Sequence, residues 1–183
     1  MSKNVVVTIG HHTCEKAANH AYLKEKAPFK SVYDEAQNKL PFLGSGYYFW
    51  DNNIEQAITW GEVHYFGKYN IVEIDLELSG EYFLDLVGSR EDMNFFNSLV
   101  SLLKSIRTDT NNYSISQYIE CFRQINKRHG YKGCFESRII RAVDCCAAGQ
   151  NKMKFNKTQL NSMPLNPRLI ICFFDKMTYL CTP

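Results

Sequence analysis

Two short stretches of the sequence hold the residues best suited to chemistry. GHHT, residues 10–13, offers two imidazoles and a hydroxyl that can form hydrogen bonds with a polar ligand. LGSGYYFW, residues 43–50, sets Gly44 and Gly46 directly before four aromatic side chains. Because glycine lets the backbone turn tightly or lets another group come close, this stretch could form the floor of a pocket for a flat ligand. The alternative interpretation is a bulged strand in the core.

Two strands must position these residues. The β-branched run at residues 5–9 predicts a buried strand that leads into GHHT. Residues 46–50 predict a second strand, in which alternation sends Tyr48 and Trp50 to one face and the remaining aromatics to the other. At least one of these faces must be buried, whatever the function.

Two helices are predicted beside these strands. Thr13 can cap a helix over residues 14–26, which Pro28 closes. Asp51-Asn52-Asn53 indicates a turn and an N-cap before a second helix over residues 54–66, whose expected apolar face holds Ile54, Ala57, Ile58 and Gly61. Trp60 on this helix is interpreted as a packing anchor rather than a ligand contact.

The remaining elements follow from periodicity and capping. Residues 70–80 alternate as a half-exposed strand, with the acidic side chains of Glu73, Asp75 and Glu77 on the wet face. Ser89 begins one predicted helix, and a second predicted helix ends at Gly130. Further expectations are one or two short strands within 131–149, a final strand over 168–176, and loops over 27–42 and 150–167.

The order of these elements predicts an α+β fold without regular βαβ alternation. We expect a single domain over residues 1–183, with the helical pair at about 89–130 as an insertion or a layer packed on a sheet. The basic cluster at residues 127–129 is interpreted as a solvated helix end rather than a nucleic-acid patch. The sequence assigns no definite role to Arg138 and Arg141, and contact with a phosphate or an acidic substrate is one interpretation.

Composition narrows the class of protein. The formal net charge is +2 and 45% of the residues are hydrophobic, which suits a packed core and does not indicate nucleic-acid binding. No apolar run approaches the length of a membrane span, and the N-terminus does not read as a signal peptide, so a cytoplasmic protein is expected. The seven cysteines are interpreted as free thiols, and no metal site is expected because zinc-ligand spacing is incomplete.

The order of three motifs resembles the ADP-ribosyltransferase superfamily of the diphtheria-toxin and poly(ADP-ribose) polymerase type, in particular its compact bacterial or phage-type members. GHHT is followed by LGSGYYFW, then by AITWG at residues 57–61, and the chain closes with the strand at 168–176. The resemblance covers about residues 4–90, including FLDLV at residues 83–87. It implies a split β-sheet core with flanking helices and NAD as co-substrate.

The resemblance also implies roles for individual residues. His11 would hydrogen-bond the adenosine ribose of NAD, and Thr13 would support that turn. Tyr48 would stack on nicotinamide, and Gly46 would keep the backbone clear of the ligand. His11 next to His12 can also be a hydrogen-bonded structural pair at a strand end.

A carboxylate is needed to stabilise the positive charge that develops as the glycosidic bond of NAD breaks. The family places an acid just ahead of the last core strand, but residues 162–168 contain none, and Asn161 stands where a Gln-x-Glu motif beginning at Gln159 would have glutamate. Glu136 is the nearest substitute. Asp144 and Asp175 are weaker candidates.

The function implied by the resemblance is transfer of ADP-ribose from NAD to a protein or nucleic acid, as in a toxin or defence effector. A cognate inhibitor would be a partner of such a toxin. Two alternatives stay open. One is a catalytically altered module that binds NAD, ADP-ribose or a partner protein, and the other is an NAD glycohydrolase.

Overall fold

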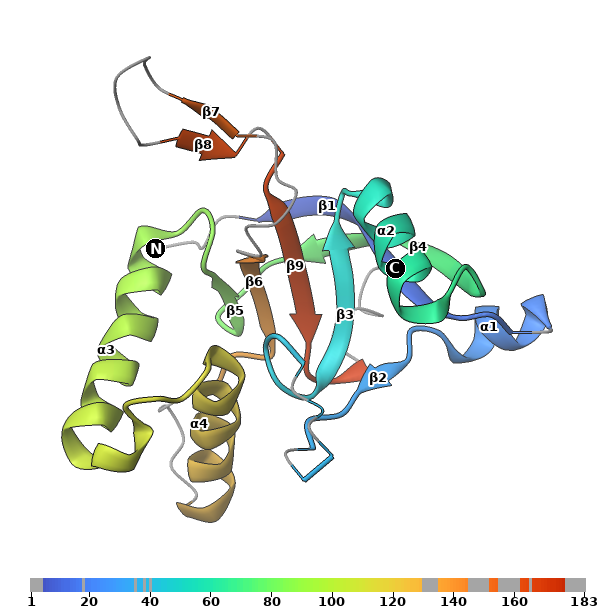
Figure 1. The fold of residues 1–183 in the computed structure, drawn as a ribbon. Helices are drawn as coiled ribbons and strands as arrows, with labels where there is room; N and C mark the ends of the chain where they lie inside the picture. Colours follow the sequence, from blue (N-terminus) through green and yellow to red (C-terminus); the bar gives the residue numbers. More distant parts are fainter. Residues whose placement is uncertain are drawn as a thin grey trace.

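The computed structural model describes residues 5–17, 19–34, 36–37, 39, 41–129, 135–144, 152–154, 162–164 and 166–176. Figure 1 shows how its helices and strands are arranged. The strands are β1 (Val6–Glu15), β2 (Lys30–Ser31), β3 (Gly46–Asp51), β4 (Tyr69–Leu78), β5 (Phe83–Asp85), β6 (Ile139–Asp144), β7 (Lys152–Lys154), β8 (Ser162–Pro164) and β9 (Arg168–Phe173). The helices are α1 (His20–Lys26), α2 (Ile54–Tyr65), α3 (Arg90–Ile106) and α4 (Ile115–His129), with a short 3-10 turn at Thr108–Thr110.

A mixed seven-stranded sheet forms the centre of the fold. Its order is β4-β1-β3-β9-β6-β5, and β2 pairs with β3. The pairs are antiparallel except for β5 and β6, which run parallel. The α+β prediction is therefore confirmed. The expectation of a loop over 150–167 was wrong in part, because β7 and β8 pair as a small separate sheet.

The two faces of the sheet carry separate cores. Tyr48 and Trp50 point to one face, where they pack with side chains from α2, α3 and α4. Phe49 and Tyr47 point to the other face, where residues of β1, β4, β5, β6 and β9 enclose a second core. The predicted alternation of residues 46–50 is thus confirmed. The segment that holds α3 and α4 is a helical layer on the sheet, as one of the two interpretations expected (Figure 1).

Strand β1 pairs very unequally with its two neighbours. It pairs with β4 along its whole length, from Val6↔Leu78 to Glu15↔Tyr69. It pairs with β3 at Gly10↔Asp51 and His11↔Trp50, and no further pair is formed by the residues of these two strands, all of which are described. Beyond His11 the two strands part, which leaves space between them.

The start of the first helix was predicted wrongly. Residues 14–15 continue β1 because they pair with β4, and α1 begins at His20 after Asn19, whose side chain accepts a hydrogen bond from Ala21 N. Thr13 is therefore no helix cap. Its hydroxyl donates a hydrogen bond of 2.9 Å to the carbonyl of Ala57 and so joins β1 to α2.

The caps of two later helices were predicted correctly. Asn53 accepts a hydrogen bond from Gln56 N at the start of α2, and Ser89 accepts one from Asp92 N at the start of α3. The buried face of α2 is narrower than expected. Ala57 and Gly61 are buried, whereas Ile54 and Ile58 are exposed.

A cluster of charged and polar side chains joins β1, β3, β5 and β6 on the second face. Arg141 of β6 reaches across β9, and its Nε donates to Asp51 Oδ2 at 2.6 Å. Its Nη1 lies 3.6 Å from Asp85 Oδ1, and the hydroxyl of Thr8 donates to Asp51. Arg141 thus has internal carboxylate partners. Arg138 lies with its guanidinium 4.7 Å from the centre of the Tyr82 ring.

Candidate functional site

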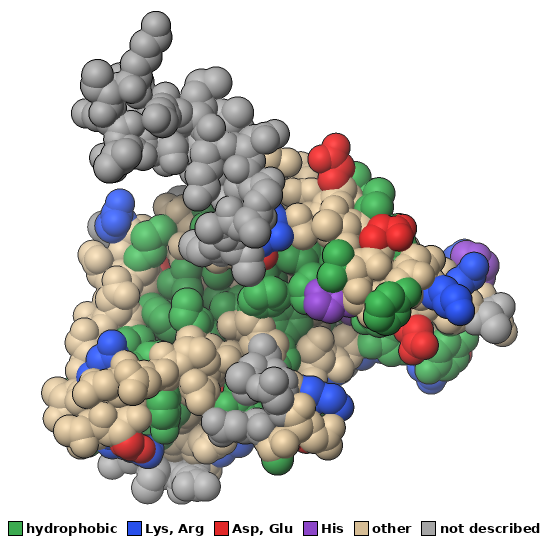
Figure 2. All heavy atoms as spheres, viewed as in Figure 1, with side chains coloured by type: hydrophobic (Ala, Val, Ile, Leu, Met, Phe, Trp, Pro, Cys, Tyr) green, Lys and Arg blue, Asp and Glu red, His purple; other side chains and the backbone are tan. Residues whose placement is uncertain are grey.

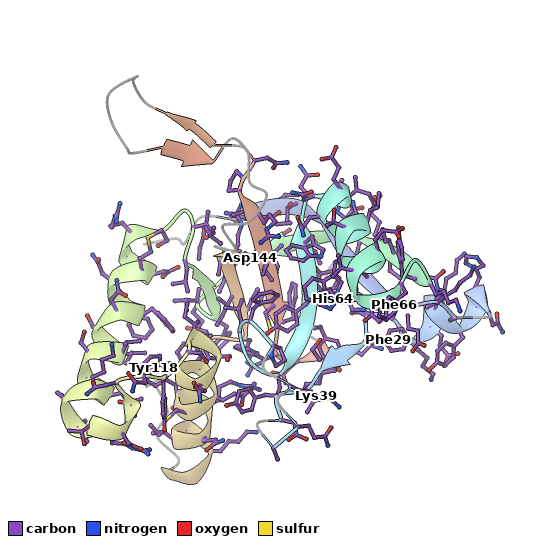
Figure 3. All side chains as sticks on the ribbon, viewed as in Figure 1. Phe29, Lys39, His64, Phe66, Tyr118 and Asp144 are labelled. Carbon is purple, nitrogen blue, oxygen red and sulfur yellow. The ribbon has the colours of Figure 1, made fainter. Side chains whose placement is uncertain are left out.

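A cavity of about 580 Å³ lies where β1 and β3 part. Its wall comes from β1, from the segment before and including β2, from the turn before β3, and from β3, α2 and β9. Figure 2 shows apolar side chains gathered over the central strands. Figure 3 labels three residues of the wall that come from distant parts of the chain, namely Phe29, Lys39 and His64.

Aromatic rings dominate one end of this cavity. Trp60 of α2 has its ring centre 5.8 Å from that of Trp50 and 5.9 Å from that of Phe42. His64, one turn further along α2, stacks on Trp60 at 3.7 Å. Both tryptophans of the chain therefore line the cavity. Flat apolar walls of this kind favour a planar ring in the ligand.

His11 combines a charged neighbour with an unsatisfied nitrogen. It is 5% exposed, and its Nε2 lies 3.2 Å from Glu73 Oε2, on the residue that pairs with it in β4. Its Nδ1 is buried and has no hydrogen-bond partner among the described residues. A buried polar atom without a partner costs about 1–3 kcal/mol, so a ligand group that satisfied it would bind more tightly. Glu73 lies on the exposed face of β4 as predicted, but it also holds this imidazole.

His12 bridges the gap between the parting strands. Its Nδ1 lies 2.8 Å from the carbonyl oxygen of Tyr48, and the backbone N–H of Phe29 donates to its Nε2 at 3.1 Å. A carbonyl can only accept and an N–H can only donate, so the contacts fix a neutral imidazole with its proton on Nδ1. One alternative from the sequence was a hydrogen-bonded structural role for the histidine pair. His12 has that role, because both of its ring nitrogens are hydrogen-bonded.

Lowering the pH should destabilise the protein through His12. Burial lowers the pKa of His12 in the folded state, although its hydrogen bond to Tyr48 opposes the shift. The stabilisation is complete above the unfolded pKa of about 6.5 and is lost as the pH falls through the lower folded pKa. Urea unfolding at a series of pH values should show a steeper loss of stability in the wild type than in His12→Gln. Equal pH dependence in the two proteins would contradict this assignment.

Tyr48 uses its hydroxyl to hold the glycine turn. The phenol donates to the carbonyl of Gly44 at 2.6 Å and accepts from the backbone N–H of Leu43 at 2.7 Å. Burial raises the pKa of Tyr48 well above its ordinary value, so the phenol stays protonated. Its ring still contributes to the cavity wall. Tyr48 is therefore part of both the turn and the cavity.

The structure brings together three of the five site residues predicted from sequence. His11, Thr13 and Tyr48 line one cavity. Gly46 and Glu136, which are both described, are not part of its wall. A Cβ on Gly46 would lie 2.3 Å from Cys172 Sγ and 2.8 Å from Phe173 O, so β9 occupies the room beside this glycine. Glu136 is exposed and precedes β6, which β9 separates from β3.

The weaker acid candidates lie elsewhere. Asp144 is buried and forms an ion pair of 2.8 Å with Arg168. Asp175 is exposed after β9. Gln159 and Asn161 lie outside the described residues.

Sequence reasoning missed several parts of the wall. Trp60 was assigned to packing, yet it lines the cavity, and His64 follows it at helical spacing. That spacing on a predicted helix was an available signal. Lys30, Lys39 and Phe42 lie in a segment that was expected to be a loop, so no periodicity pointed to them. The two lysines add positive charge to the wall.

The described part of the chain contains free thiols but no cluster of metal-ligating side chains. Within it, no cluster of three or more histidine, cysteine, aspartate or glutamate side chains could hold a metal ion. Cys14, Cys121 and Cys172 are free thiols, and burial raises the pKa of Cys172 to about 12. The described helices also include none that is long and apolar enough to cross a membrane.

Comparison with protein-family models, with curated proteins and with solved structures finds no match. The class of this protein therefore follows from its own fold and site. It is an α+β protein with a mixed seven-stranded sheet, and two of its central strands part around an aromatic and histidine-lined cavity.

Proposed function

We propose that this chain binds NAD in the cavity and transfers ADP-ribose from it to a macromolecule, as the sequence resemblance implies. The observation that carries the proposal is the meeting of His11, Thr13 and Tyr48 in one cavity wall. These residues come from two motifs that are far apart in the sequence. The buried Nδ1 of His11, which has no hydrogen-bond partner among the described residues, gives this wall a polar atom that a ligand can satisfy.

The chemistry of the wall matches the parts of a dinucleotide. Trp60, Phe42 and Trp50 offer ring faces for a flat base. The unsatisfied Nδ1 of His11 suits a ribose hydroxyl, because Glu73 can hold the proton of the ring on Nε2. Lys30 and Lys39 supply positive charge for a diphosphate. The volume of about 580 Å³ lies within the range of ligand cavities.

In the proposed reaction, the bond between C1′ of the ribose and the nicotinamide nitrogen breaks, and the electron pair leaves with nicotinamide. A nucleophile of the acceptor forms the new bond to C1′ and loses its proton. The positive charge that develops on the ribose needs a nearby negative charge. Neither Glu73 nor Glu136 is part of the wall, but Glu73 contacts His11, which is.

A second candidate function is binding of NAD or ADP-ribose without transfer. The position of Glu136 outside the cavity wall favours it, because the acid that the resemblance called for is not beside the ligand site. A third outcome is hydrolysis, in which water takes the place of the macromolecular acceptor. The products separate the three functions.

Intrinsic fluorescence gives a direct binding test, since both tryptophans line the cavity. The purified chain is titrated with NAD and with ADP-ribose, and nicotinamide release and transfer of labelled ADP-ribose to proteins and nucleic acids are then measured. Transfer supports the main proposal, intact bound NAD supports the binding module, and free ADP-ribose as the sole product supports the glycohydrolase. No fluorescence change together with no nicotinamide release would reject all three.

Replacing His11 with alanine should weaken NAD binding about tenfold, because a buried hydrogen bond contributes about 1 kcal/mol and its loss leaves a void. The measurement is the dissociation constant from the tryptophan titration. His20→Ala on α1 is the control, since His20 is exposed and is not part of the cavity wall. Equal affinities of His11→Ala and the wild type would remove His11 from the binding site.

A further inference from the structure

The turn before β3 forms one lip of the cavity. Pro41 and Phe42 line the cavity, and Phe42 contacts Trp60 across it. Within the turn, Gly44 N donates a hydrogen bond of 3.1 Å to Pro41 O. The hydroxyl of Tyr48 adds the two contacts to the turn described above. The position of this lip therefore depends on all the contacts that hold the turn, including those from other elements.

Two side chains of helix α4 form hydrogen bonds with the backbone of Ser45 in this turn. Glu120 Oε1 accepts a hydrogen bond of 2.5 Å from Ser45 N, and Arg123 Nη1 donates one of 3.1 Å to Ser45 O. Arg123 Nη1 also lies 3.4 Å from Glu120 Oε1. The two side chains are 15% and 18% exposed, so water competes weakly for these contacts. We name this pair the α4 clamp.

The clamp explains the first glycine of the LGSG sequence. Gly44 has a φ of +86°, and a Cβ at this position would lie 2.7 Å from Glu120 Oε1. A side chain there would be strained and would also push the carboxylate away. Arg123, the second residue of the clamp, is held by Phe174, which lies just after β9. Its guanidinium lies 4.2 Å from the centre of the Phe174 ring.

We propose that Glu120 and Arg123 are positioning residues for the cavity. Neither is part of its wall, but together they hold the turn so that Phe42 stays against Trp60. Through this clamp α4 is connected to the turn at the edge of the ligand site, although it contributes no residue to the wall. The expected change in NAD affinity rests on the proposed function. The expected change in the position of Phe42 relative to Trp60 does not depend on it.

A purely structural role makes a different prediction. If the clamp only stabilised the fold, removing it would lower the free energy of unfolding and leave the environment of Trp60 in the folded protein unchanged. If it positions the lip, the signal of Trp60, whose ring contacts that of Phe42, must change in the folded protein. Trp60 is the local probe, and the control is a variant rather than Trp50, because Trp50 also lines the cavity and its ring centre lies 5.8 Å from that of Trp60.

The experiment is ¹⁹F NMR on protein labelled with 5-fluorotryptophan, with Trp60→Phe used to assign the two lines. Glu120→Ala should shift the Trp60 line and weaken NAD binding about tenfold, because the hydrogen bond that fixes the turn is lost. Glu120→Gln should restore both, since its amide oxygen can still accept from Ser45 N. Gln124→Ala is the matched control, because Gln124 is exposed on the same helix.

Glu120→Asp keeps the charge beside Arg123 but withdraws the carboxylate by one methylene, so it tests the same point if Glu120→Ala does not fold. Combining Glu120→Ala with Tyr48→Phe should cost less than the sum of the two affinity losses, because both side chains hold the same turn. An unchanged Trp60 line in Glu120→Ala and Glu120→Asp would overturn the proposal. Absence of NAD binding by the wild type would reject the proposed function alone, since the fluorine signal needs no ligand.

Discussion

Replacing Arg141 with methionine should lower the free energy of unfolding by about 3 kcal/mol, because it leaves a buried carboxylate without its cation. Arg141 Nε lies 2.6 Å from Asp51 Oδ2, and the Asp51 side chain is 3% exposed. Asp85 is less dependent on this guanidinium, because its Oδ1 also accepts from the backbone N–H groups of Val87 and Gly88. The loss is therefore expected to come mainly from Asp51.

Urea unfolding of the single and double variants measures this effect. Adding Asp51→Asn to Arg141→Met should recover more than half of the loss, because the unpaired charge is removed and the amide oxygen can still accept from Thr8. Arg138→Met is the control for loss of a nearby arginine, since Arg138 is exposed. A loss below about 1 kcal/mol for Arg141→Met would mean that the cluster behaves as a surface ion pair.

Replacing Gly46 with alanine should also cost about 3 kcal/mol, because the added methyl overlaps a packed neighbouring strand. The new Cβ would meet Cys172 Sγ at 2.3 Å and the backbone oxygen of Phe173 at 2.8 Å. The sulfur is part of a fully buried side chain, and the carbonyl belongs to β9. The carbonyl cannot move without disturbing the pairing of β3 with β9.

This variant separates two explanations of the glycine. If Gly46 keeps room for a ligand, alanine should weaken NAD binding in a protein of normal stability. If it keeps room for β9, stability falls, and adding Cys172→Ala should relieve part of the cost but not the contact with Phe173 O. Gly80→Ala is the control. Gly80 has a φ of +85° with nothing within 4 Å of its added Cβ, so only the backbone cost of about 1 kcal/mol is expected there.

Much of the local structure could be predicted from the sequence. The strand at residues 46–51 has the predicted alternation of faces, and the helix over 90–106 begins at the predicted Ser89 cap. The exposed acidic face of β4 was also correct. These features depend on neighbouring residues and on whether each side chain is polar, so they can be read locally.

The candidate site residues were selected by the resemblance rather than by a local pattern. His11, Thr13 and Tyr48 were selected from two motifs, and the structure places all three in one cavity wall. The hydrogen bonds of Thr13 and Tyr48 could not be predicted from the sequence, because their partners lie in α2 and in the glycine turn. The place of Glu136 depends on strand order, which no local pattern determines.

The sequence by itself determined the α+β class, most of the strands and helices, and the alternation of side chains along β3. Only the tertiary structure decided that β1 continues to Glu15, that His12 bridges the parted strands, and that α4 grips the turn beside the cavity. The physical reason is the range of the interactions. Periodicity and caps act within a few residues, whereas strand pairing, buried ion pairs and side-chain clamps join residues that only the folded chain brings together.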